Sequence, residues 1–76
     1  MNKARRKGIK EIASQLDEAR GALEELQVEE EEYRGNIPEN LQGSARYEAS
    51  DAACEALSDA VSGLDEIIAS LDELTE

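Results

Sequence analysis

Aromatic residues are scarce in this 76-residue sequence. Tyr33 and Tyr47 are the whole aromatic content, so a core must come from Leu, Ile, Val and Ala. Those residues are typical of helical bundles, whereas strands are enriched in aromatic and β-branched side chains. A chain of this length forms one domain and buries only about 60% of the surface that its unfolded form exposes. The sequence therefore predicts an all-α domain over residues 1–76 with a small core.

Histidine is absent, and cysteine occurs once. Without histidine the chain lacks the commonest general base and the commonest metal ligand, and a di-iron site of the Glu-x-x-His type is excluded. Cys54 has no partner for an internal disulfide, and its place among apolar residues indicates a small core side chain. We therefore predict no enzyme activity, no catalytic residue, no cofactor and no metal site.

Long apolar stretches are also lacking, so neither a signal peptide nor a membrane span is expected. We expect a cytoplasmic protein with no membrane contact. The net charge of −11 repels bare nucleic acid over most of the surface. Direct nucleic-acid binding is therefore not expected, and a protein partner with a basic surface is favoured.

Apolar residues recur in two series whose steps alternate between three and four residues, which is the pattern of a heptad repeat with apolar a and d positions. The first series is Ile9, Ile12, Leu16, Ala19, Leu23, Leu26, Glu30 and Tyr33, and the second is Tyr47, Ser50, Cys54, Leu57, Val61, Leu64, Ile68 and Leu71. They predict helices over about 3–34 and 44–74. In the loop at 35–43, Gly35 suits a left-handed residue, Pro38 stops the first helix, and Ser44 is a good N-cap.

The two series match when the helices run antiparallel. Opposed residues, such as Ile12 with Ile68 and Glu30 with Ser50, have numbers that add to 80 along the whole length. Independent helices would have no reason to share this symmetry. The sequence therefore predicts an antiparallel two-helix hairpin, a coiled coil, with Ile37 and Leu41 covering its loop end.

The second helix carries a further apolar row at its g positions. This row is Ala53, Ala60, Ile67 and Leu74, whereas the matching row of the first helix is Gln15, Ala22 and Glu29. One partner helix cannot cover a face of that width, so we predict that two hairpins pair as a homodimer in a four-helix bundle. The bundle topology stays open at this point.

Charge is segregated along the chain. Residues 1–10 carry five bases and no acid, and residues 11–76 carry three bases and all nineteen acids. The bases Lys3, Arg5, Arg6, Lys7 and Lys10 could contact phosphate, as in a sponge for a phosphorylated signalling molecule, but pairing with acids at the end of the second helix is the simpler interpretation. The acidic run at residues 29–32 lacks the spacing of a calcium loop, and Arg34 is expected to neutralise part of it through Glu30.

The second helix also carries a candidate acidic binding face, made of Glu48, Asp51, Glu55, Asp59, Asp65, Glu66, Asp72 and Glu73. Duplex DNA presents regularly spaced negative charge to basic grooves, and a rigid helix lined with carboxylates can imitate it. The alternative is that these acids only keep a bundle soluble. Sequence alone leaves both interpretations open.

The segment PENLQGSARYE at residues 38–48, with the LDE and LDEL steps that begin at Leu64 and Leu71, resembles small uncharacterised acidic helical-hairpin proteins. Phages and other mobile elements of Gram-positive bacteria, including gut species, carry these proteins. The resemblance implies a context in which compact acidic proteins often block host nucleic-acid-binding defence enzymes. We therefore hypothesise a non-enzymatic protein-binding module, with a structural coiled-coil scaffold as the alternative.

Overall fold

Two long helices make up most of the molecule, and a side-chain cap begins each of them. In a computed structural model, which describes all 76 residues, α1 spans Lys3–Gly35 and α2 spans Ala45–Leu74. The Asn2 side chain accepts a hydrogen bond from the backbone N–H of Arg5, and the Ser44 hydroxyl accepts one from that of Tyr47. These bonds satisfy amide groups that have no partner within the helix. The predicted N-cap role of Ser44 is confirmed.

α1 ends without any residue in the left-handed backbone conformation. Gly35 is still part of α1 and no glycine has a positive φ, so the prediction for Gly35 is wrong. Asn36 stays close to helical geometry, at φ −89° and ψ −5°, because its N–H still reaches the carbonyl oxygens of Glu32 and Tyr33. Pro38 then ends the helical path, as predicted.

A single 3-10 turn, η1, spans Glu39–Leu41 at the tip of the hairpin. Ile37 is only 4% exposed, which confirms that it covers the loop end. The same prediction for Leu41 is wrong, because this side chain is 45% exposed. The backbone N–H of Leu41 bonds the carbonyl oxygen of Pro38, so the turn closes on itself and leaves the leucine facing solvent.

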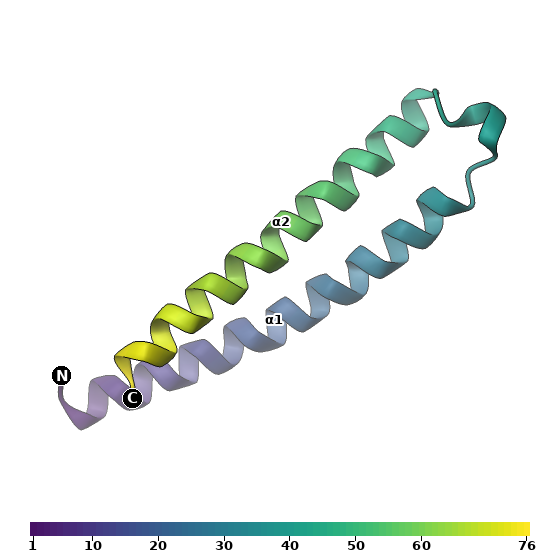
Figure 1. Ribbon diagram of the computed structural model, residues 1–76. Coiled ribbons are helices and arrows are strands. Elements are labelled where there is room, and N and C mark those ends of the chain that lie inside the picture. Colours follow the sequence, from purple (N-terminus) through teal and green to yellow (C-terminus); the bar gives the residue numbers. More distant parts are fainter.

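The helices pack against each other in antiparallel directions, so both termini lie at one end of a rod and η1 lies at the other (Figure 1). The rod measures 59 × 14 × 14 Å. The predicted antiparallel two-helix hairpin is confirmed. Its first helical turn extends beyond the end of α2, so the N-terminal residues overhang the rod (Figure 1).

The hairpin buries very little of itself. Four residues are buried, namely Ala13, Ile37, Ser50 and Cys54, and no side chain is fully enclosed. The radius of gyration is 17.3 Å, whereas a compact chain of this length has about 11 Å. The accessible surface is 5561 Å², against about 4,600 Å² for a compact monomer of the same mass. One hairpin therefore exposes roughly 1,000 Å² more than a compact monomer of its size.

α2 turns its predicted seam towards α1, but α1 is rotated from its predicted orientation. Apart from Gly8 and Gly21, the less exposed residues of α1 occupy the a and e positions: Ile9, Ala13, Leu16, Arg20, Leu23, Gln27, Glu30 and Arg34. The d residues Ile12, Leu26 and Tyr33 are each more than 40% exposed, so they lie along one edge of the seam, where Tyr33 still accepts a hydrogen bond from Arg46 of α2. Ion pairs from the e residues Arg20 and Arg34 to α2 lie along the opposite edge of the seam.

A polar pair inside the seam confirms the predicted opposition of Glu30 and Ser50. The Ser50 hydroxyl donates to Oε2 of Glu30 at 2.9 Å.

Ser50→Ala should lower the free energy of unfolding by about 1 kcal/mol, because the half-buried carboxylate loses this donor. Urea denaturation measures the change. Ser58→Ala, an exposed position on the same helix, is the control, and an equal effect at both positions would contradict the account.

Gly21 lies in the middle of α1 and leaves the helix without a side chain at that point. A Cβ built there meets no heavy atom within 4 Å. Gly21→Ala should therefore raise the free energy of unfolding by about 1 kcal/mol, because alanine loses less backbone entropy in a helix. Thermal denaturation should show a midpoint about 4–8 °C higher. A lower midpoint would mean that another surface covers Gly21.

Candidate interaction surfaces

The hairpin has two unlike sides along its seam. In an antiparallel pair the g rows adjoin on one side and the e rows on the other. We define the apolar face as the outward d row of α1 with the g row of α2: Ile12, Ala19, Leu26, Tyr33, Ala53, Ala60, Ile67 and Leu74. The acidic face is the set of eight α2 acids named above.

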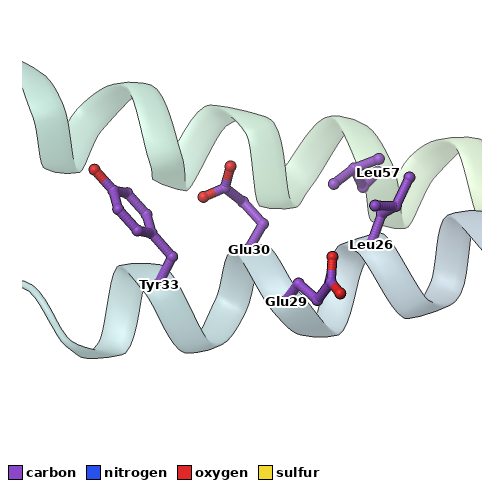
Figure 2. A pocket seen from close by; sticks show the side chains of 5 residues that line it. All are labelled: Leu26, Glu29, Glu30, Tyr33 and Leu57. Carbon is purple, nitrogen blue, oxygen red and sulfur yellow. The ribbon is translucent and has the colours of Figure 1, made fainter.

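The apolar face exposes large side chains without cover. Leu26 is 51% exposed and Ile67 is 50% exposed, and Ile12 and Leu74 are similar. Towards the loop end the face contains an open groove lined by Leu26, Glu29, Glu30, Tyr33 and Leu57. In this groove Leu26 lies beside Leu57, and Tyr33 and Glu30 point across towards α2 (Figure 2). The sequence identified the α2 row of this face and missed the α1 row, because it had assigned the d positions to the seam.

A cation–π contact between the two helices lies at the loop end of the apolar face. The Arg46 guanidinium carbon lies 5.1 Å from the centre of the Tyr33 ring, and its Nε donates a hydrogen bond to the Tyr33 hydroxyl. Such a contact is favourable because the ring face carries negative potential. The pair also indicates the register of the face, because steps of seven residues from Tyr33 and Arg46 are expected to bring Leu26 beside Ala53, Ala19 beside Ala60, and Ile12 beside Ile67.

Ion pairs close the opposite side of the seam. Nη1 of Arg34 lies 2.8 Å from Oδ1 of Asp51, and Nε of Arg20 lies 3.3 Å from Oδ1 of Asp65. The hydrogen bond to Asp51 raises the pKa of Arg34 above its ordinary value. The prediction that Arg34 neutralises Glu30 is wrong, because the guanidinium reaches across to α2. Most of the large exposed apolar side chains beside the seam therefore lie on the apolar face.

The eight predicted acids of α2 are all exposed. Asp51 and Asp65 are held by the two arginines, and the other six have no cation within 4 Å: Glu48, Glu55, Asp59, Glu66, Asp72 and Glu73. Two acids of α1 that were not predicted as part of this face, Glu24 and Glu31, line grooves between the helices beside Asp65 and beside Asp51 and Glu55. From the first to the last of the six, 25 positions correspond to about 37 Å of helix. That length is close to one turn of B-DNA, about 34–36 Å.

The basic residues of the first helical turns make no ion pair. All five are exposed, and none lies within 4 Å of a carboxylate. The interpretation that they pair with the end of α2 is wrong in this hairpin, because Asp65 bonds Arg20 and the first turn overhangs the end of α2 (Figure 1). The terminal end of the rod therefore carries a free positive cluster.

The structure shows no arrangement of side chains suited to a metal ion: no three His, Cys, Asp or Glu residues are grouped to hold one. In the acidic run, Glu30 bonds Ser50 and Glu31 accepts from Gln27 at 3.0 Å. Cys54 lies buried between the helices, at 5% exposure. Neither helix contains an apolar stretch long enough to cross a membrane.

Comparisons with known proteins assign no family: no family model matches the chain, and neither a curated protein nor a solved structure matches it. The resemblance to hairpin proteins of mobile elements stays a prediction. The function is therefore argued from the two surfaces and the positive end of the rod.

Proposed function

We propose that this protein is a non-enzymatic binding module in which two hairpins join through their apolar faces and present carboxylates to a basic surface of another protein. The observation that carries the proposal is the separation of the two surfaces. Uncovered leucine and isoleucine side chains lie on one side of the seam, and unpaired acids lie along the rest of α2. A module with this design can associate and bind a partner at the same time.

Self-association follows from the thin core. Isolated pairs of helices are marginally stable, and this one leaves four of its largest apolar side chains about half exposed. Pairing of two apolar faces would give a homodimeric four-helix bundle, in which these residues become core. The free energy of unfolding should then rise with protein concentration.

The acidic face supports a nucleic-acid mimic as the specific form of binding. Six unpaired carboxylates spread over a straight helix offer negative charge over the length that a DNA-binding groove contacts. The target would be a host nucleic-acid-binding protein, such as a defence enzyme, that the module inhibits. The resemblance to proteins of phages and mobile elements agrees with this role.

Affinity capture from a bacterial lysate tests the mimic. The tagged protein should retain nucleic-acid-binding proteins, and added duplex DNA and sodium chloride should both release them, since the contact is between exposed charges. If capture persists unchanged at high salt and in excess DNA, the acids serve solubility alone. The protein would then be a structural coiled-coil scaffold that holds partners through apolar contacts.

The free positive cluster at the terminal end permits a different ligand, a phosphorylated signalling molecule. Its five exposed bases could contact phosphate groups. Titration calorimetry with cyclic nucleotides tests this possibility. Absence of heat would exclude it, and saturable binding would replace the proposal above.

A further inference from the structure

We infer that the second copy of this chain lies antiparallel to the first, with the loop end of one hairpin beside the terminal end of the other. This inference rests on the proposed self-association and adds the direction of pairing. The charge along the rod supports the direction, and the uncovered surface and the side-chain sizes along the apolar face support pairing over the whole length of the rod.

The uncovered surface matches another hairpin in area and in length. The excess over a compact monomer is roughly 1,000 Å², and each partner in a standard stable interface buries about 800 Å². Exposed apolar side chains extend from Ile12 and Leu74 near one end of the rod to Leu26 and Tyr33 near the other. A second rod of the same 59 Å length covers all of them, whereas a short ligand would leave one end uncovered.

Side-chain sizes along the apolar face are compatible with a second copy that runs in the reversed direction. Two of its three alanines, Ala19 and Ala60, lie at the middle, where a two-fold axis would pass. Reversal about that axis sets Ile12 against the second copy's Leu26, and Ile67 against the second copy's Ala53. Parallel copies related by a two-fold axis would instead oppose Ile12 with the second copy's Ile67 and Leu26 with the second copy's Ala53. Side-chain sizes therefore permit close packing along the whole face, and charge decides the direction.

Charge along the rod favours the antiparallel direction. The loop-end half, residues 21–60, carries eleven acids and two bases, a net charge of −9. The terminal half, residues 1–20 with 61–76, carries eight acids and six bases, a net charge of −2. Parallel pairing would bring the two −9 halves together. Antiparallel pairing places each −9 half beside a −2 half, where the five free bases can approach the acids of the loop end.

Pulsed electron resonance between nitroxide labels tests the direction. Cys54→Ala removes the native thiol, and each label is attached to one introduced cysteine. One sample carries Asn40→Cys at the loop end, and a separate sample carries Asp59→Cys at the middle of α2. Antiparallel pairing predicts a loop-end separation close to the 59 Å length of the rod. Parallel pairing predicts roughly 20 Å, because neighbouring helices lie about 8–10 Å apart. The middle label should give a short separation of roughly 25 Å in either direction.

Each outcome decides a different part of the proposal. A long loop-end distance with a short middle distance supports antiparallel pairing. Short distances at both positions, or a mixture of both at the loop end, overturn it and leave self-association standing. No measurable distance at either position overturns self-association itself.

Zero-length cross-linking of the unmodified chain provides a second measurement that needs no substitution. Links from Lys3 or Lys7 to acids at 29–39 would join opposite ends of the rod and can only form between antiparallel copies. If only links within one end form, the inference is overturned.

Discussion

Replacing both Leu26 and Ile67 with glutamate should convert the protein from a dimer to a monomer of 8.3 kDa. The two side chains lie on different helices of the apolar face, and both are about half exposed in the single hairpin. Burying two carboxylates in an apolar interface costs several kcal/mol, since a charge loses its hydration there. The expected loss of dimer affinity is therefore at least about a thousandfold, or about 4 kcal/mol. Light scattering at micromolar concentration measures it.

Val28→Glu is the matched control for this substitution. Val28 is 49% exposed, close to the value for Leu26, but it lines a groove on the ion-pair side of the hairpin, with Arg20 and Asp65. The control should keep the dimer mass and the same concentration-dependent stability. If Val28→Glu dissociates the protein and the paired substitution does not, the association surface has been assigned to the wrong side of the hairpin.

Neutralising four unpaired acids of α2 should weaken binding to a basic partner about tenfold to a hundredfold. The variant is Glu48→Gln, Glu55→Gln, Asp59→Asn and Glu66→Gln, which keeps the size of each side chain. Each exposed charge pair contributes roughly 0.2–1 kcal/mol, so four of them account for the estimate. Affinity for the captured partner, measured at two salt concentrations, should also become less salt-dependent.

A second variant with the same change in net charge isolates the role of position. Glu11, Glu18, Glu25 and Glu32 form an exposed row on α1, and none of them makes an ion pair. Changing all four to glutamine should reduce affinity much less than the α2 variant. Equal losses would show that the partner senses only total charge, and no loss in either variant would favour the scaffold function.

The sequence predicted the hairpin because several independent features indicate the same topology. Two heptad series mirrored about Asn40, a proline in the loop and a serine N-cap all require the same topology. The rotation of α1 was not predictable in this way. Rows d and e both flank the a positions, and the choice between them depends on whether Arg20 and Arg34 reach acids of α2. The spacing of apolar residues does not show which charged side chains form ion pairs between the helices.

The candidate surfaces were predicted only in part, for the same reason. The row of Ala53, Ala60, Ile67 and Leu74 was visible because it exceeds the width of one seam. Its extension over Ile12 and Leu26 appeared only once α1 was seen to turn these residues outwards. The sequence also failed to predict that the N-terminal bases are free. The antiparallel register places them beside acids at the end of α2, but in the structure none of these bases lies within 4 Å of a carboxylate.

Self-association through the apolar face is the central claim, and the mass of the unmodified chain in solution tests it most directly. Sedimentation equilibrium at micromolar concentration should give twice the chain mass of 8.3 kDa, with dissociation only on strong dilution. A mass of 8.3 kDa throughout that range would contradict the claim, because a lone hairpin would then be stable with its apolar face in water.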